Sequence, residues 1–259
     1  MPRPQIPSRN TMIWPQWPAP HGVKALVTTR LGGVSHSPWD SFNLASHVGD
    51  DEKDVASNRQ LFQQWLGDGL KPQWLNQTHG TEVLEVSGSN QVFDADAAFS
   101  SEINQICTVL TADCLPVFFC DRLANHVAVS HAGWRGLGAG ILENTLSTFS
   151  APPKDIMAWL GPAIGPKHFE VGDDVVDFYR QNYPRLNEKR IFFPFQGRSS
   201  KFLMDIYEAA RQILASQGLR HIYGGDLCTY SDAERFYSYR RENICGRMAS
   251  CIWLSRSSI

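Results

Sequence analysis

The chain has 259 residues, of which 42% are hydrophobic and 19% are charged, and its formal net charge is −2. This composition is typical of a globular protein, and the near-neutral charge without a basic run argues against general nucleic-acid binding. The proline-rich start has no apolar core of signal-peptide length, and the longest strongly apolar run, around 115–120, is too short to cross a bilayer. We therefore expect a cytoplasmic protein without membrane spans.

The first half of the chain alternates short strands with one long irregular segment. The pattern predicts a strand over 24–29, an irregular stretch rich in Gly, Ser, Pro and Asn, and a helix over 51–66 with Asp50 or Asp51 as its N-cap. Strands follow near 73–77 and 82–86. An irregular segment of this length inside a compact domain is usually functional.

The second half carries the most apolar strands. Two β-rich runs over 106–121 are broken at 112–114, and a strand over 126–131 ends in a glycine-containing turn. The patterns then predict helices over 136–149, 172–183 and 205–218, strands near 156–160, 221–230 and 248–254, and a loop over 238–247. Because strands and helices alternate irregularly, we predict a single α/β (α+β) domain over 1–259, with mixed sheets covered by helices.

Three loops place a possible metal ligand where an apolar strand meets a turn. They are NQTHG at 76–80, TADCLP at 111–116 and HAGWRG at 131–136, with His79, Cys114 and His131 as the ligands. Separations of 35 and 17 residues do not fit a zinc finger, but they suit three strands that converge on one point. Three such ligands leave the fourth tetrahedral position of a zinc ion open, as in catalytic sites. The sequence thus favours a catalytic zinc centre.

A second interpretation uses the same atoms. Cys114 is one of six cysteines, none of which forms a CxxC pair, so neither a zinc knuckle nor, in the cytosol, a disulfide framework is expected. Cys114 can also be a nucleophile with His131 or His79 as its base, in the manner of a cysteine hydrolase. Asp113, beside it, is a candidate proton carrier or a residue that holds the turn.

Arginines near glycines suggest an anion site. Arg135 lies in a glycine-flanked turn before a predicted helix, and Arg30 and the pair Arg240-Arg241 are similar candidates. Aromatic residues near these loops could stack on a flat ligand or serve in packing; they are Trp39, Phe42, Trp134 and Phe236.

At these loops the sequence closely resembles the YfiH family, also called the multicopper polyphenol oxidase or laccase-domain family. The matching motifs run through almost the whole chain: TTRLGGVS at 28–35, SFNLASHVGDD at 41–51, NQTHG at 76–80, TADCLPV at 111–117, HAGWRGLGAG at 131–140, WLGPAIGP at 159–166, FEVG at 169–172, LCTYSD at 227–232, FYSYRR at 236–241 and GRMAS at 246–250. Thr78 departs from the pattern, since many members have valine there.

The resemblance implies a zinc-dependent purine nucleoside enzyme with His79, Cys114 and His131 as metal ligands. Family members are associated with phosphorolysis of adenosine, inosine and S-methyl-5′-thioadenosine and with adenosine deamination. The small-molecule substrates are then a nucleoside and phosphate, and Arg30, Asn43, Arg135 and Arg240 are the candidates for binding them. The phosphorolysis prediction rests on the resemblance alone. The implied fold is similar to the catalytic domain of cytotoxic necrotizing factor, a Cys/His hydrolase.

Two other activities are attached to the family. Some bacterial members are linked to peptidoglycan editing, in which a wrongly incorporated serine is removed from a UDP-muropeptide precursor; this amide hydrolysis is the main alternative. The laccase label implies copper and phenol oxidation. A multicopper oxidase needs a separate histidine-rich copper cluster, whereas the eight histidines of this chain show no HxH pair.

Overall fold

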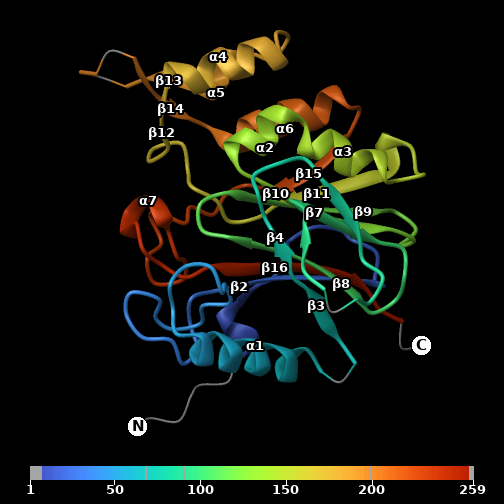
Figure 1. Cartoon of the computed structure of the whole chain (residues 1–259). Helices are drawn as coiled ribbons and strands as arrows, with labels where there is room; N and C mark the ends of the chain where they lie inside the picture. Colours follow the sequence, from blue (N-terminus) through green and yellow to red (C-terminus); the bar gives the residue numbers. More distant parts are fainter. Residues whose placement is uncertain (1–7, 68, 90, 196, 199, 257–259) are drawn as a thin grey trace.

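The computed structural model describes residues 8–67, 69–89, 91–195, 197–198 and 200–256. Two sheets lie face to face at its centre, and helices cover their outer faces (Figure 1). The first sheet has the order β1 (Met12–Ile13), β2 (Val23–Thr28), β16 (Met248–Leu254), β8 (Gln105–Thr111), β3 (Lys71–Gln73). The second has the order β15 (His221–Gly224), β11 (Ile156–Leu160), β9 (Leu115–Asp121), β10 (Val127–Ala132), β7 (Ala97–Ser100), β5 (Val83–Glu85). Both sheets contain parallel and antiparallel pairs, which confirms the predicted α/β fold with mixed sheets.

Strand β9 shows why the centre of the chain is a continuous apolar run. All seven of its residues are buried. Val117 and Phe119 pack under the helices, whereas Phe118 and Cys120 pack between the two sheets. Since successive side chains of a strand point to opposite faces and both faces are covered, β9 has no solvent-facing position.

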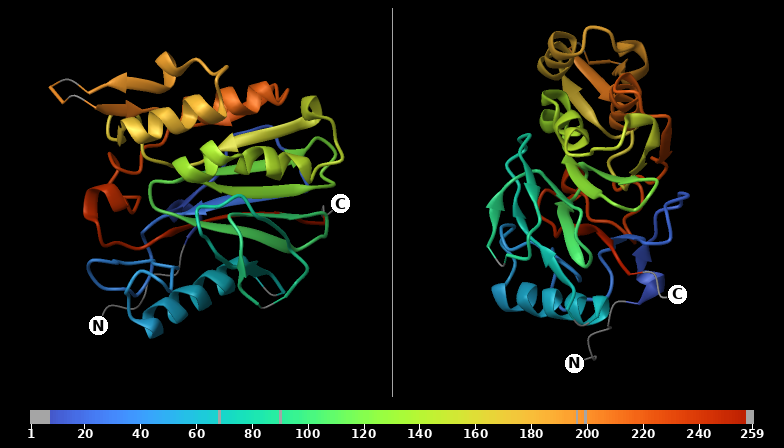
Figure 2. Two further views of the ribbon diagram at one scale, coloured as in Figure 1. Left: turned by 45° about the horizontal axis from the view of Figure 1, so that its top comes forward. Right: turned by 90° about the vertical axis from the view of Figure 1, so that its right-hand side faces the viewer.

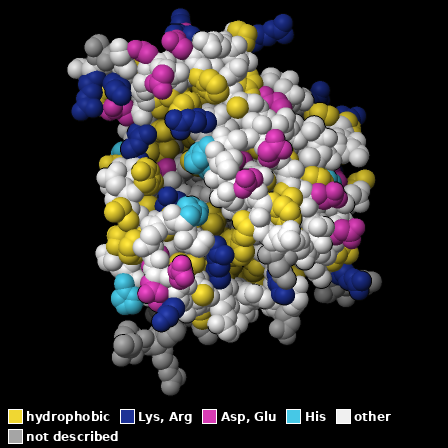
Figure 3. Space-filling view, viewed as in Figure 1, with side chains coloured by type: hydrophobic (Ala, Val, Ile, Leu, Met, Phe, Trp, Pro, Cys, Tyr) yellow, Lys and Arg dark blue, Asp and Glu magenta, His cyan; other side chains and the backbone are white. Residues whose placement is uncertain are grey.

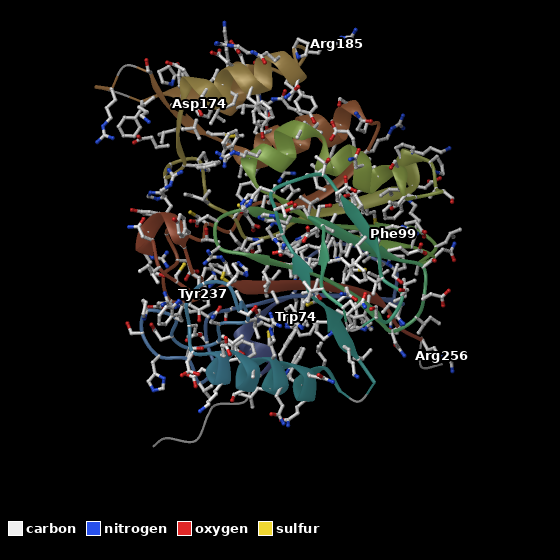
Figure 4. All side chains as sticks on the ribbon, in the orientation of Figure 1. Trp74, Phe99, Asp174, Arg185, Tyr237 and Arg256 are labelled. Atoms are coloured by element: carbon white, nitrogen blue, oxygen red, sulfur yellow. The ribbon has the colours of Figure 1, made fainter. Side chains whose placement is uncertain are left out.

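Helix α1 (Glu52–Leu66) covers the outer face of the first sheet. Its buried Phe62 packs in the apolar cluster on that face. The Asp51 side chain accepts a hydrogen bond from the Lys53 backbone N–H, so the predicted N-cap is confirmed at Asp51. Trp74 packs against the same cluster (Figure 4), and the Arg59 guanidinium lies 4.3 Å from the centre of its ring.

Helices α2 (Trp134–Ala139), α3 (Ile141–Ser147) and α6 (Ile206–Ser216) cover the second sheet. Beyond them lie α4 (Asp173–Asn182), α5 (Glu188–Ile191) and a small sheet of β12 (Glu170–Gly172), β14 (Lys201–Met204) and β13 (Phe192–Pro194) (Figure 2). The prediction of one helix over 136–149 is wrong. Gly140 adopts a left-handed conformation (φ 103°), which ends α2 before α3 begins.

Two other segments differ from the prediction. The strand expected over 73–77 is interrupted at Trp74, and its second part, β4 (Leu75–Asn76), pairs with β6 (Phe93–Asp94). The loop expected over 238–247 contains α7 (Tyr239–Glu242). The buried Tyr237 precedes α7 (Figure 4), and its hydroxyl donates to the Trp39 carbonyl at 2.6 Å. This bond holds the irregular segment after β2 against the C-terminal loop. None of the described helices is long and apolar enough to cross a membrane.

Candidate metal centre

Three segments distant in sequence bring His79, Cys114 and His131 together. His79 follows β4, Cys114 directly precedes β9, and His131 is the penultimate residue of β10. One nitrogen of each histidine and the cysteine sulfur all lie within 4.8 Å of one another. His79 Nε2 is 3.8 Å from Cys114 Sγ, and the two imidazoles meet edge to face with ring centres 4.7 Å apart. The structure thus joins the three residues that the loops predicted as ligands.

Positive backbone φ angles shape the turns that carry two of these residues. His79 itself has φ 59°, and Asp113, just before Cys114, has φ 89°. Residues other than glycine adopt such angles at an energetic cost, so surrounding contacts must fix them. The Asp113 carbonyl accepts a bond from the Ile164 N–H at 2.9 Å, and the His79 N–H donates to Asp96 Oδ1 at 3.0 Å.

Asp96 is one residue of the candidate site that the sequence analysis missed. Its side chain is fully buried and accepts a hydrogen bond from His131 Nδ1 at 2.7 Å. The same carboxylate accepts bonds from the backbone N–H groups of the turn over 78–80, at 3.1, 3.0 and 2.6 Å. One carboxylate therefore positions both histidines. The available signal was an acidic residue directly before the apolar strand β7.

Two glycines let the segments approach closely. A Cβ atom on Gly133 would lie 2.9 Å from His79 Cδ2 and 3.0 Å from Cys114 Sγ. A Cβ on Gly136 would lie 2.9 Å from the Gly80 carbonyl oxygen. Real Cβ atoms essentially never lie within 3.0 Å of another atom, so a larger residue at either position would force a neighbouring loop to shift.

Charges in the site favour ionised donors. Burial raises the pKa of Cys114, but the charge and hydrogen bonding of His131, and then of His79, outweigh it and lower that pKa to about 6. Burial also opposes protonation of His131, yet the charge of Cys114 and the bond to Asp96 raise its pKa to about 9. Burial raises the pKa of Asp96, but His131 and the backbone N–H groups of Gly80 and Thr78 together outweigh it and lower that pKa to about 2. In the metal-free chain, these shifts favour a thiolate beside an imidazolium.

The donor set fits a tetrahedral metal ion. Because a carboxylate only accepts hydrogen bonds, Asp96 fixes the proton on His131 Nδ1 and leaves Nε2 for a metal. Bond lengths of about 2.0–2.3 Å place the donors of tetrahedral zinc roughly 3.3–3.8 Å apart. The distance of 3.8 Å between His79 and Cys114 is close to that range. His79, Cys114 and His131 could therefore hold one ion and leave one coordination position free.

The carboxylate of Asp113 is bonded to groups outside this donor set. It accepts hydrogen bonds from Thr229 Oγ1 at 2.6 Å, Ser238 Oγ at 3.0 Å and the Arg240 N–H at 2.7 Å. The side chain is 8% exposed. Since both carboxylate oxygens already accept bonds, this arrangement favours the predicted role of holding the turn over that of carrying a proton.

Two cavities flank the donor set, and both are lined by His79, Ala112, Cys114 and Tyr239. The first, which we call the aromatic cavity, measures about 250 Å³ and is also lined by Asp113, Trp134, Arg135, Ile164, Phe169, Ile206 and Arg240. The second, the histidine–arginine cavity, measures about 390 Å³ and is also lined by His47, Gln77, Leu110, Thr111, His131 and Arg247. Figure 3 shows a hollow near the middle of this face, bordered by histidine and by lysine or arginine side chains.

The predicted arginines and Asn43 occupy different places. Arg135 and Arg240 line the aromatic cavity, with their guanidinium groups over the rings of Trp134 (4.3 Å) and Phe169 (5.3 Å). Arg30 lines neither cavity; it pairs with Glu242 at 2.8 Å.

Asn43 is fully buried, and its side chain bonds Asp50 and accepts the Arg247 N–H at 3.0 Å. The structure therefore brings two of these four residues into a cavity beside the donor set, and it adds Arg247, His47 and Tyr239, which the sequence analysis did not select.

Several known proteins match this chain over nearly their whole length. The purine nucleoside phosphorylase YfiH of Escherichia coli K12 is 49% identical over 244 residues, which are 94% of this chain and 98% of that protein. A crystal structure of a Neisseria meningitidis protein superimposes with a TM-score of 0.90 at 45% identity, covering 95% of this chain and all of that one. The structure of YlmD from Geobacillus stearothermophilus gives 0.85 at 31% identity, with 98% and 100% covered. A profile of the family described as multi-copper polyphenol oxidoreductase laccase matches residues 24–255. The chain belongs to this family, which is that of YfiH.

Proposed function

We propose that this chain is a zinc-dependent purine nucleoside phosphorylase that acts on adenosine, inosine and S-methyl-5′-thioadenosine and also deaminates adenosine. The observation that carries the proposal is the convergence of His79, Cys114 and His131 between two cavities. The E. coli relative is named a purine nucleoside phosphorylase and is 49% identical to this chain over 94% of its length, which supports purine nucleosides as the substrates.

Zinc suits the donors better than copper does. Two imidazoles and one thiolate with a free position are a typical catalytic zinc set. Zinc bound there would supply Lewis acidity to a group of the substrate or to water. A multicopper oxidase needs a further copper cluster, and the described residues contain one group of three metal-binding side chains.

The aromatic cavity has the features that a purine nucleoside needs. Trp134, Phe169 and Tyr239 present rings, and Ile164 and Ile206 add apolar surface. Flat bases bind well between aromatic and apolar side chains. Arg135 and Arg240 can donate hydrogen bonds to the base or the ribose, because in the described part of the chain neither forms an ion pair.

The proposal is tested by metal analysis together with product analysis. Purified protein is expected to hold about one zinc per chain, and to convert adenosine and phosphate into adenine and ribose 1-phosphate, with inosine as a second product. A chelator should abolish both reactions and zinc should restore them. Full activity in metal-free protein, or no turnover of any of the three nucleosides by zinc-loaded protein, would overturn it.

One observation favours amide hydrolysis as a second candidate. Asp96, His131 and Cys114 form a chain in which a carboxylate orients an imidazole next to a thiolate of lowered pKa, as in cysteine hydrolases. The substrate would be a UDP-muropeptide precursor that carries serine in place of another residue. Release of free serine from that precursor, without turnover of nucleosides, would favour this activity over phosphorolysis.

A further inference from the structure

The histidine–arginine cavity has an arginine and no carboxylate in its wall. Of its lining residues Arg247 carries a positive charge, and none is an aspartate or glutamate. Burial lowers the pKa of His47 first, and the charges of Arg247 and Arg59 lower it further. Two arginine charges therefore act on the same imidazole. A cavity with arginine charge and no carboxylate attracts anions.

Arg247 is held in place without a carboxylate. Its Nη1 donates to the carbonyls of Cys245 and Gly246 at 2.8 and 3.0 Å, and its backbone N–H donates to Asn43 Oδ1. Nearby, Arg30 and Arg241 both pair with Glu242 at 2.8 Å. Across the described residues Arg247 has no ion pair, so its remaining N–H groups and its charge are available to a ligand.

The cavity wall also contains a hydroxyl group, that of Thr111, without a hydrogen-bond partner among the described residues. Thr111 is 2% exposed. A buried hydroxyl without a partner has a cost in free energy, because its hydrogen bonds to water are lost and not replaced. A ligand oxygen that accepts this hydrogen would remove the cost.

We propose that the histidine–arginine cavity binds inorganic phosphate, with Arg247, His47 and Thr111 as its binding residues. This inference rests on the proposed phosphorylase function. It differs from the expectation that Arg30, Arg135 or Arg240 binds phosphate. The two cavities share His79, Cys114 and Tyr239, so a ribose at this shared wall would have the base on one side and phosphate on the other.

This placement suits the displacement that phosphorolysis requires. A phosphate oxygen forms a bond to C1′ while the bond from C1′ to the purine nitrogen breaks and its electron pair leaves with the purine. The proton of the hydrogen phosphate ends on the purine, so the products are ribose 1-phosphate and the neutral base. Attack opposite to the leaving group needs the two reactants on opposite faces of C1′. Cavities on either side of the shared residues meet that need.

The test is titration of zinc-loaded protein with inorganic phosphate by calorimetry, without nucleoside. Arg247→Gln should weaken phosphate binding by about tenfold or more, the loss of one charge-assisted contact. Arg135→Gln should leave the dissociation constant for phosphate within about twofold. Arg185→Gln is the matched surface control, since this exposed arginine, labelled in Figure 4, lines neither cavity. Phosphate binding that falls in Arg135→Gln and persists in Arg247→Gln would overturn the inference, as would the absence of phosphate binding to the parent protein.

A second arm separates free phosphate from a phosphate ester. AMP is titrated in parallel, and the inference requires inorganic phosphate to bind in the presence of saturating adenine, with which it cannot react. Binding of AMP alone, lost in Arg247→Gln, would assign the cavity to a substrate phosphoryl group and would overturn the cosubstrate role. Phosphorolysis of nucleosides is measured separately from phosphate binding. Phosphorolysis that survives Arg247→Gln with an unchanged KM for phosphate would overturn the inference and leave the proposed function standing.

Discussion

The buried carboxylate of Asp96 accepts a hydrogen bond from His131 Nδ1 at 2.7 Å. The same group accepts the backbone N–H of His79 at 3.0 Å, so a single side chain fixes one imidazole ring and the loop that carries the other. Buried carboxylates paired with histidines in this way set which ring nitrogen faces a metal. Asp96 therefore orients both histidines of the candidate donor set.

Asp96→Asn should weaken zinc binding by about 10- to 100-fold, as changes at such partners of a metal-binding histidine usually do. The amide keeps the shape of the side chain, but it loses the charge and one of the two accepting oxygens. Competition with a chromophoric chelator measures the affinity. Asp94→Asn is the matched control, because Asp94 is two residues away, exposed, and bonded to Asn76. Equal zinc affinities in both variants would show that Asp96 does not position the donors.

Asp113→Asn should destabilise the fold and impair nucleoside binding while the zinc content stays the same. Three donors converge on this carboxylate, and the amide cannot accept all of them, which costs about 1–3 kcal/mol. Because Arg240 and Tyr239 begin α7, the KM for nucleoside should rise by more than kcat falls. Thermal unfolding and steady-state kinetics measure both effects, with the exposed Asp173→Asn as control.

A proton-carrying role for Asp113 gives a different pattern. In that case the kcat of deamination falls, whereas the kcat of phosphorolysis and the KM values of both reactions stay the same. The melting temperature barely changes. The comparison of the two reactions in one variant therefore separates the anchoring role from the catalytic one.

Gly133→Ala should impair the metal centre with little effect on the rest of the fold. The added Cβ would contact His79 and Cys114 at 2.9 and 3.0 Å, so one of the donors must move. A displacement of about 1 Å in a catalytic group can cost roughly 10²-fold in rate. Gly22→Ala is the control, because its Cβ meets ordinary contacts at 3.5 and 3.6 Å. Normal zinc content and activity in Gly133→Ala would mean that the loops adjust without strain.

Sequence patterns selected the three residues that converge in the structure because each stands where an apolar strand meets a turn, as β9 and β10 show. They did not locate Asp96, since its partners lie 16–35 residues away and one acidic residue before a strand has no distinctive spacing. Local patterns also missed the end of α2 at Gly140. A glycine within a helical pattern of apolar residues can either be tolerated or end the helix, and the pattern does not distinguish the two. Arg247 and Arg30 look alike in the sequence. Pairing with Glu242, which depends on tertiary structure, separates them.

Cys114 should react with iodoacetamide in the metal-free protein down to about pH 6, where its thiol is half ionised. A free cysteine, with a pKa of about 8.5, loses its thiolate as the pH falls below 8.5. Because His131 is the main cause of the low value, Asp96→Asn should move the midpoint upward by weakening the imidazolium. Mass spectrometry of the labelled peptide over pH 5–9 gives the profile. The buried Cys107, whose pKa is raised by burial, serves as the unreactive reference in the same protein.

Bound zinc should suppress this reaction until a chelator removes the metal, since a coordinated thiolate is a weaker nucleophile than a free one. The metal-ligand role also predicts that Cys114→Asp keeps some zinc and some deaminase turnover, because a carboxylate binds zinc at about 2.0–2.2 Å. As a replacement nucleophile for acyl transfer it would be poor. Rapid labelling of Cys114 in zinc-loaded protein, unchanged by the chelator, would contradict the ligand assignment. The chain from Asp96 through His131 to Cys114 would then act as the catalytic group of a cysteine hydrolase.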